Sequence, residues 1–274
     1  MDYYQNDSQV LDSEEDYLDE SKEIFKSLIK GMSFVSEMKK HTKLIGRKEE
    51  LQLLEESLYK KRMKNSVIVG SAGVGKTAIV EELAHRIKDK YYVVRMDIPC
   101  VVAGTKYRGE FEEKLTSALN KISKFNAKSK KPIIIFIDEI HTLARAGGAE
   151  GAIDAGNIVK PFLSSGEITI IGATTLKEYN ECIKKDNALS RRLPAIYIKS
   201  LNDEETLEVL KSFCDGEINE EGLKYIYEKS RNIPNSQNPD ISIEILDRCM
   251  ARSKCRNEDV SNKMIDEIIE YFLR

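Results

Sequence analysis

The chain contains 274 residues, 41% hydrophobic and 32% charged, with a formal net charge of −3, which is typical of a globular protein of one or two domains. Its longest unbroken apolar run, Ile133 to Ile137, is far shorter than the roughly 20 residues of a membrane-spanning helix, so we expect no membrane insertion. The nearly balanced charge and the five cysteines without a CxxC pair favour a cytoplasmic protein with reduced thiols and no general attraction to nucleic acid.

The N-terminal segment is strongly acidic, because residues 1–20 hold eight acidic side chains and neither Lys nor Arg. Such a segment is typically a solvated, disordered tail, and the alternative is a docking segment for a partner. Apolar residues then recur at helical spacing and predict a helix near residues 20–37, which packs on the protein itself or on a partner. We therefore assign residues 1–38 to an acidic, partly disordered leader that contains this helix.

Short β-rich runs begin at residue 66 and alternate with helical patterns. We expect strands at Ser66–Val69, Tyr91–Met96, Ile133–Ile137, Ile168–Ile171 and Ala195–Ile198. Apolar residues at helical spacing lie between them, first from Ile79 to Ile87 and then from Phe111 to Ile122. Strands that alternate with helices in this way predict an α/β domain with a central parallel sheet, to which we assign residues 39–199.

The strand pattern stops near residue 200, and only helical patterns follow. Asn202 is followed three residues later by Glu205, which predicts a capped helix at Asp203–Phe213. We expect further helices near residues 220–230, 241–253 and 258–273. Residues 200–274 are therefore predicted to form a small, all-helical domain.

A glycine-rich loop with the pattern GxxxxGKT lies between the first strand and the first helix of the α/β domain. Glycines let backbone N–H groups turn inward around phosphate oxygens, and the following helix presents its positive end to the same anion. Lys76 is expected to reach the β- and γ-phosphates, and the Thr77 hydroxyl to ligate Mg²⁺. The loop predicts binding of a nucleotide through Gly70, Ser71, Ala72, Gly73, Val74, Gly75, Lys76 and Thr77.

A second acidic pair, Asp138 and Glu139, follows the apolar run that ends at Ile137. Ligands of open α/β sheets lie at the carboxyl ends of the strands, which is where this pair is expected. Asp138 is suited to hold Mg²⁺ directly or through water, and Glu139 to act as the general base on the attacking water. The alternative is an acidic helix start that interacts favourably with the helix dipole.

Five further blocks of the sequence are informative besides the glycine-rich loop, and they are Leu44-Ile-Gly-Arg47, Ala103-Gly-Thr-Lys-Tyr107-Arg-Gly-Glu, Phe136-Ile-Asp-Glu-Ile-His-Thr-Leu, Gly151-Ala-Ile-Asp-Ala-Gly-Asn157 and Gly172-Ala-Thr-Thr-Leu-Lys-Glu-Tyr179. In this order, the loop and these blocks resemble the first nucleotide-binding domain of the Clp AAA+ unfoldases (ClpA, ClpB and ClpC). The resemblance extends from about Leu44 to the C-terminus and implies an AAA+ fold with a helical lid and ATP hydrolase activity.

The resemblance also implies roles for single residues. Leu44 and Ile45 match the segment that covers the adenine, and Thr175 matches the sensor of the γ-phosphate. Arg191 and Arg192 match the paired arginines that act on the nucleotide of a neighbouring subunit, where a guanidinium offers planar, always-charged recognition of phosphate. One departure is that the family's Pro-Asp-Lys-Ala stretch reads Pro239-Asp-Ile-Ser242 here, without the lysine.

The resemblance further implies a substrate-gripping pore loop around Tyr107, flanked by Lys106 and Arg108. An aromatic side chain in a loop can wedge against an extended chain with little sequence preference. We therefore expect a single-module Clp-like ATPase that forms a homo-hexamer and remodels or unfolds polypeptides, with an adaptor or protease partner left open. The alternatives are a helper ATPase that acts on nucleic acid or a mobile-element complex, and a nucleotide-gated scaffold.

Overall fold

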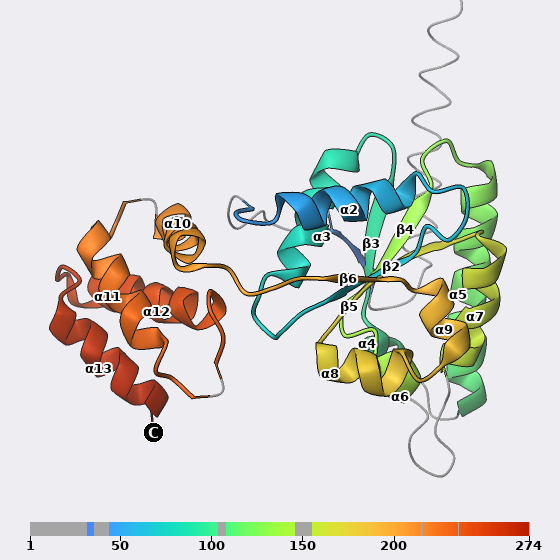
Figure 1. Cartoon of the computed structure of the whole chain (residues 1–274). Helices are drawn as coiled ribbons and strands as arrows, with labels where there is room; N and C mark the ends of the chain where they lie inside the picture. The colour runs from blue at the N-terminus through green and yellow to red at the C-terminus, as the bar shows by residue number, and fades with distance from the viewer. Residues whose placement is uncertain are drawn as a thin grey trace, which may run out of the picture.

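The computed structural model describes residues 32–35, 44–103, 108–145, 155–214, 216–234 and 236–273. A β-sheet flanked by helices is followed along the chain by a bundle of four helices, which lies beside the sheet part in Figure 1. Within these residues, every helix is too short or too polar to span a bilayer.

The sheet has six strands in the order β1-β3-β4-β5-β2-β6. The five strands expected from the sequence are all present and parallel to one another, which confirms the predicted α/β class. The strand expected at Ile168–Ile171, β5, extends to Thr174, three residues beyond its expected end. Its added end is held by the Gly70 N–H, which donates to the Thr174 carbonyl at 3.2 Å. The strand bounds are β1 (Met32–Phe34), β2 (Ser66–Val69), β3 (Tyr92–Met96), β4 (Ile133–Ile137), β5 (Thr169–Thr174) and β6 (Ala195–Tyr197).

The prediction of a helix near residues 20–37 is wrong for the part of that segment that the structure describes, because Met32–Phe34 form the strand β1. β1 pairs antiparallel with β3, so that Met32 faces Met96 and Phe34 faces Val94. The Phe34 ring also packs edge-on against Tyr92, with ring centroids 5.9 Å apart. Backbone pairing with an open sheet edge thus outweighs the helical spacing of the apolar residues. Val35, which follows β1, is buried, and residues 1–31 and 36–38 lie outside the described residues.

Helices cover both faces of the sheet, with α2 and α3 on one face and α5 and α7 on the other (Figure 1). The central strand β4 is buried over all five residues, as expected for a strand covered on both sides. Its alternate side chains enter the two cores: Ile135 packs on the α5 and α7 side, and Phe136 packs on the α2 and α3 side. The helix bounds are α2 (Lys48–Leu58), α3 (Lys76–Ile87), α4 (Ile98–Ala103), α5 (Arg108–Lys128), α6 (Thr142–Arg145), α7 (Ala155–Ser165), α8 (Leu176–Glu178), the π-helical turn η2 (Tyr179–Ile183) and α9 (Asn187–Arg192).

The same truncation at a core and a surface leucine should separate burial from helix propensity. Leu115 of α5 is fully buried in the sheet core, whereas Leu53 of α2 is 53% exposed. We expect Leu115→Ala to lower the free energy of unfolding by about 2–5 kcal/mol, because a cavity remains beside β4. Leu53→Ala should change it by only about 0.5 kcal/mol. Denaturant unfolding of both variants measures the difference, and equal losses would contradict this core.

The four helices after residue 200 pack around their own apolar core, in which Leu210, Ile226 and Ile245 are fully buried. The predicted cap of the first helix is confirmed. Asn202 Oδ1 accepts the Glu205 backbone N–H at 2.8 Å, and Glu205 Oε2 accepts the Asn202 N–H at 2.9 Å. The bundle consists of α10 (Asp203–Cys214), α11 (Glu220–Ser230), α12 (Asp240–Arg256) and α13 (Asn262–Leu273).

Candidate functional site

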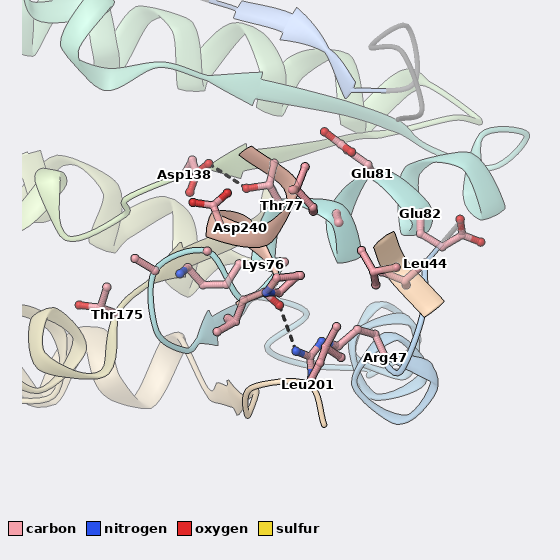
Figure 2. Close-up of a pocket in the computed structure, with 18 of the residues that line it drawn as sticks. Leu44, Arg47, Lys76, Thr77, Glu81, Glu82, Asp138, Thr175, Leu201 and Asp240 are labelled. Carbon is pink, nitrogen blue, oxygen red and sulfur yellow. Dashed lines mark hydrogen bonds between the residues drawn. The ribbon is translucent and has the colours of Figure 1, made fainter. Parts of the chain in front are cut away.

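A pocket of about 500 Å³ lies between the carboxyl ends of the sheet strands and the helical bundle. The sheet part contributes the glycine-rich loop, the start of α3, and the segments that follow β4 and β5. The part after residue 200 contributes Leu201 before α10, Val209 within α10, and side chains from the start of α12, among them Asp240 (Figure 2). The predicted loop residues 72–77, together with Leu44, Ile45, Asp138, Glu139 and Thr175, all line this pocket.

The glycine-rich loop is shaped by left-handed backbone at two positions. Gly75 has a φ of +91° and immediately precedes α3, so the loop turns directly into the helix N-terminus. Gly73 has a φ of +71°, and a Cβ atom there would lie 2.5 Å from Cβ of Asp240 in the bundle. Side chains larger than hydrogen are therefore unfavourable at both positions. The open backbone at the start of a 12-residue helix is suited to an anion.

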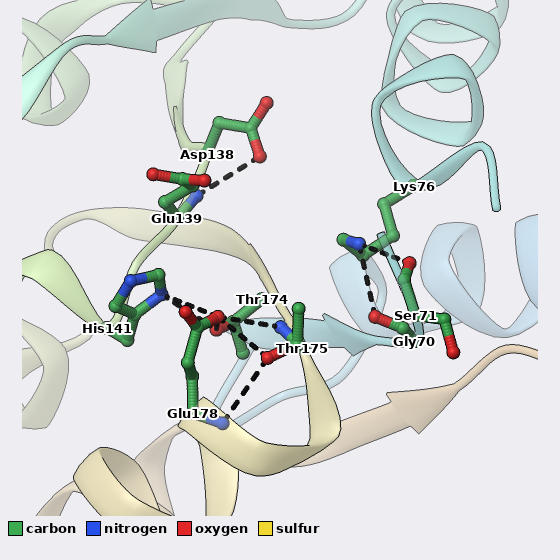
Figure 3. Close-up of polar contacts among 9 residues, drawn as sticks. All are labelled: Gly70, Ser71, Lys76, Asp138, Glu139, His141, Thr174, Thr175 and Glu178. Carbon is green, nitrogen blue, oxygen red and sulfur yellow. Dashed lines mark hydrogen bonds and ion pairs between the residues drawn. The ribbon is translucent and has the colours of Figure 1, made fainter. Parts of the chain in front are cut away.

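Lys76 is held against this loop by its own backbone carbonyls. Its Nζ donates to the Gly70 carbonyl at 3.1 Å and to the Ser71 carbonyl at 2.7 Å (Figure 3). Burial lowers the pKa of the Lys76 ammonium, while the charges of Asp138, Glu178 and Glu139 oppose that shift. A phosphate group would offer this ammonium stronger acceptors than two neutral carbonyls.

Thr77, at the start of α3, and Asp138, directly after β4, bring two oxygen ligands together. The Thr77 hydroxyl donates to Asp138 Oδ2 at 3.1 Å, and Asp138 Oδ1 accepts the Glu139 backbone N–H at 3.1 Å. Hydroxyl and carboxylate oxygens are the ligands that Mg²⁺ prefers, so this pair fits that ion. The described residues contain no group of three or more His, Cys, Asp or Glu side chains that could hold a metal ion by themselves. Mg²⁺ would therefore need further oxygens from water and phosphate.

Glu139 follows Asp138 in a strained, left-handed conformation with a φ of +53°. The next residue holds this turn in place, because Ile140 donates its N–H to the Ala173 carbonyl of β5 at 3.0 Å. Ile140 also fills the space where a side chain on Gly172 would lie. The Glu139 carboxylate is exposed to the pocket, and outliers of this kind are concentrated at functional sites.

A polar cluster below Glu139 links the ends of β4 and β5 (Figure 3). Glu178 Oε2 accepts the Thr175 hydroxyl at 2.8 Å and the Thr174 hydroxyl at 3.2 Å, and it lies 3.2 Å from Nδ1 of the buried His141. Burial acts to raise the pKa of the Glu178 carboxyl, but hydrogen bonds from Thr175 and the nearby His141 outweigh it and bring the pKa below its usual value. The expected sensor, Thr175, is thus fixed as the N-cap of α8.

The opposite end of the pocket is largely apolar. Leu44 and Ile45 line the pocket there, as do Leu201, Val209 and Ile243 from the part of the chain after residue 200. Beneath them Arg47, only 4% exposed, donates to the Val74 carbonyl at 3.0 Å. Burial lowers the pKa of this guanidinium, and the charges of Glu50 and Glu205 act against that shift.

Sequence reasoning missed the pocket residues that the bundle supplies, together with Arg47 and Glu178. The available signals were the quoted blocks that contain Arg47 and Glu178, and the altered stretch that begins at Pro239, since Pro239 and Asp240 both line the pocket. Spacing along the chain cannot indicate that α12 folds back onto the glycine-rich loop.

The two predicted arginines lie elsewhere on the same chain. Arg191 and Arg192 occupy the last turn of α9 and line a separate hollow beside Leu163 and Ser164. Arg192 donates to the Ala188 carbonyl of its own helix at 2.8 Å. The structure therefore does not bring them to the pocket of this chain. Lys106 and Tyr107 lie outside the described residues, as does the side chain of Arg108.

Comparison with known proteins identifies relatives of this arrangement. Residues 66–199 match the model of the ATPase family associated with various cellular activities (AAA). The chaperone protein ClpB of Aquifex aeolicus is 41% identical over 229 residues, which cover 78% of this chain and 22% of ClpB. The ATP-binding subunit ClpC of the Clp protease of Staphylococcus epidermidis is 40% identical over 238 residues, or 81% of this chain and 28% of ClpC.

Solved structures agree with these sequence matches. A structure of the S. cerevisiae Hsp104–ADP complex superposes with a TM-score of 0.75 at 30% identity, covering 87% of this chain and 44% of that one. The chain thus spans less than a third of the two curated relatives named above and under half of Hsp104. The matched region includes the glycine-rich loop and the Asp138–Glu139 pair. The chain therefore belongs to the AAA+ ATPases of the Clp type.

Proposed function

We propose that this ATPase remodels or unfolds polypeptides as a cytoplasmic homo-hexamer. The main support for the proposal is that the predicted site residues of one chain lie at two separate places. The phosphate loop and the acidic pair share a pocket, whereas Arg191 and Arg192 lie on a different surface. A neighbouring copy that presents its arginines to this pocket would complete the site.

Each predicted site residue of the pocket has a chemical task in this proposal. The backbone amides of the loop and the Lys76 ammonium bind the phosphates, and the apolar end with Leu44 and Ile45 accepts the adenine. Thr77 and Asp138 hold Mg²⁺, which supplies charge neutralisation on the phosphates when bound. Glu139 takes a proton from the attacking water. Thr175 hydrogen-bonds the γ-phosphate or that water.

The two parts of the chain and the predicted pore loop complete the proposal. Residues 39–199 act as the ATPase body and residues 200–274 as a lid, because the pocket is lined from both. Residues 1–38 remain a leader segment, tail-like or docking, except that Met32–Phe34 join the sheet of the body as β1. Tyr107, with Lys106 and Arg108, grips the polypeptide. One relative in this comparison, Hsp104 of S. cerevisiae, is known in complex with casein, which favours a polypeptide over other substrates.

The substrate class is tested by asking which polymer stimulates ATP turnover. We expect an unfolded protein such as reduced, denatured casein to raise the rate of phosphate release several-fold, because a gripped chain engages the working cycle. Single-stranded and double-stranded DNA should leave the rate unchanged. Stimulation by DNA alone would favour the nucleic-acid helper instead, and nucleotide binding without any turnover would favour the scaffold.

A further inference from the structure

Arg95 of β3 carries a positive charge next to the acidic pair, at a position that sequence reasoning did not single out. β3 lies beside β4 with Arg95 opposite Phe136, two residues before Asp138. The guanidinium NH2 lies 3.5 Å from Asp138 Oδ2, with the Arg95 side chain 35% exposed and the Asp138 side chain 24% exposed. This oxygen is the same one that accepts the Thr77 hydroxyl.

Asp138 does not depend on Arg95 for its orientation. The Thr77 hydroxyl holds Oδ2, and the Glu139 backbone N–H holds Oδ1, both at 3.1 Å. Both of these donors are neutral, so they fix the carboxylate without cancelling its charge. The contribution of Arg95 is therefore mainly electrostatic.

The charges around Asp138 determine whether Arg95 favours or disfavours a bound cation. The charges of Asp138, Glu139 and Glu178 all act on the Lys76 ammonium, and all three acids line the pocket. Arg95 offsets one of them. A divalent cation that binds Asp138 Oδ2 lies close to the Arg95 guanidinium, which pairs with the same oxygen. The two positive charges repel each other, so the guanidinium disfavours binding of the cation.

We propose that the Arg95 guanidinium occupies the place of a metal cation beside Asp138 in the nucleotide-free site. It thereby raises the Mg²⁺ concentration that is needed for Mg²⁺ to bind there with the nucleotide. The inference rests on the proposed function, because it takes Thr77 and Asp138 as the metal-side groups. Since the pair is partly exposed and screened by salt, the effect is limited to about three- to tenfold in the Mg²⁺ requirement. Arg95 acts only through its charge on Asp138 and touches no reacting atom.

The test compares nucleotide binding with and without Mg²⁺ in the full chain. A fluorescent, non-hydrolysable ATP analogue is titrated first in EDTA, and Mg²⁺ is then titrated at fixed analogue. In Arg95→Met we expect the half-saturating Mg²⁺ concentration to fall about three- to tenfold, with the affinity in EDTA unchanged within about twofold. Arg95→Gln, a second variant without the charge, should give the same shift.

Two controls separate charge from structure. Arg95→Lys keeps the charge and should retain the wild-type Mg²⁺ requirement. Arg256→Met removes a comparable exposed guanidinium, paired with Glu267 at 3.6 Å in the bundle, and should change neither titration. An unchanged or higher Mg²⁺ requirement in both Arg95→Met and Arg95→Gln would overturn the inference. Failure of the wild-type protein to bind the analogue under either condition would instead overturn the proposed function.

Discussion

A Glu139→Gln variant should bind ATP as the wild type does but hydrolyse it about 10²–10⁴-fold more slowly. The amide keeps the size of the side chain but cannot accept a proton from water. The strained turn at Glu139 is held by the backbone bond from Ile140 to Ala173, which the substitution leaves in place. Calorimetry measures the binding, and phosphate release under saturating ATP measures the turnover.

A matched control tests whether any exposed glutamate has this effect. Glu221 is exposed in the first turn of α11, away from the pocket residues. Glu221→Gln should leave both binding and turnover at wild-type values. Normal turnover in Glu139→Gln would reject Glu139 as the general base, and loss of ATP binding would show that the residue serves the pocket structurally.

An Arg191→Ala variant should lose most of its ATP turnover although its own pocket is intact. Arginines that reach the transferred phosphate contribute on the order of 10³–10⁵ in rate in other nucleotidases. Arg191 and Arg192 lie outside the pocket of their own chain, so the loss would arise in the neighbouring copy. Mixing Arg191→Ala with Lys76→Ala should restore part of the activity, because mixed rings contain some pockets with an intact lysine and an intact arginine.

The control for this experiment removes an arginine from the bundle surface. Arg248 pairs with Glu244 on the exposed side of α12, and Arg248→Ala should keep full turnover alone. Phosphate release is followed over a range of mixing ratios at constant total protein. If no ratio exceeds the summed activities of the two separate variants, the arginines do not act between subunits.

The elements that the sequence predicted correctly are those whose signal is local. The run Ile133–Ile137 is apolar throughout and forms the fully buried β4, and Asn202 with Glu205 forms the predicted capping box. The glycine-rich loop likewise determines its own shape, because Gly73 and Gly75 adopt the left-handed backbone that other residues avoid.

The missed features depend on contacts between segments far apart in the chain. Met32 and Val35 belong to a helical spacing of apolar residues, yet Met32–Phe34 form a strand because the edge of β3 is open to pairing. Asp240 lines the pocket because α12 returns to Gly73, more than 160 residues earlier in the chain. Arg95 reads as an ordinary polar residue of a strand until β3 and β4 lie side by side. Such placements follow from tertiary packing rather than from local pattern.

The central claim is that two copies build each ATP site, and the mass of the active species tests it most directly. Mass photometry with a non-hydrolysable ATP analogue, combined with phosphate release from the same preparation in ATP across a dilution series, relates assembly to turnover. The account predicts a particle with the mass of a homo-hexamer of the 31.2 kDa chain, and turnover per chain that falls as dilution separates it. Full turnover per chain from particles of 31.2 kDa would contradict it.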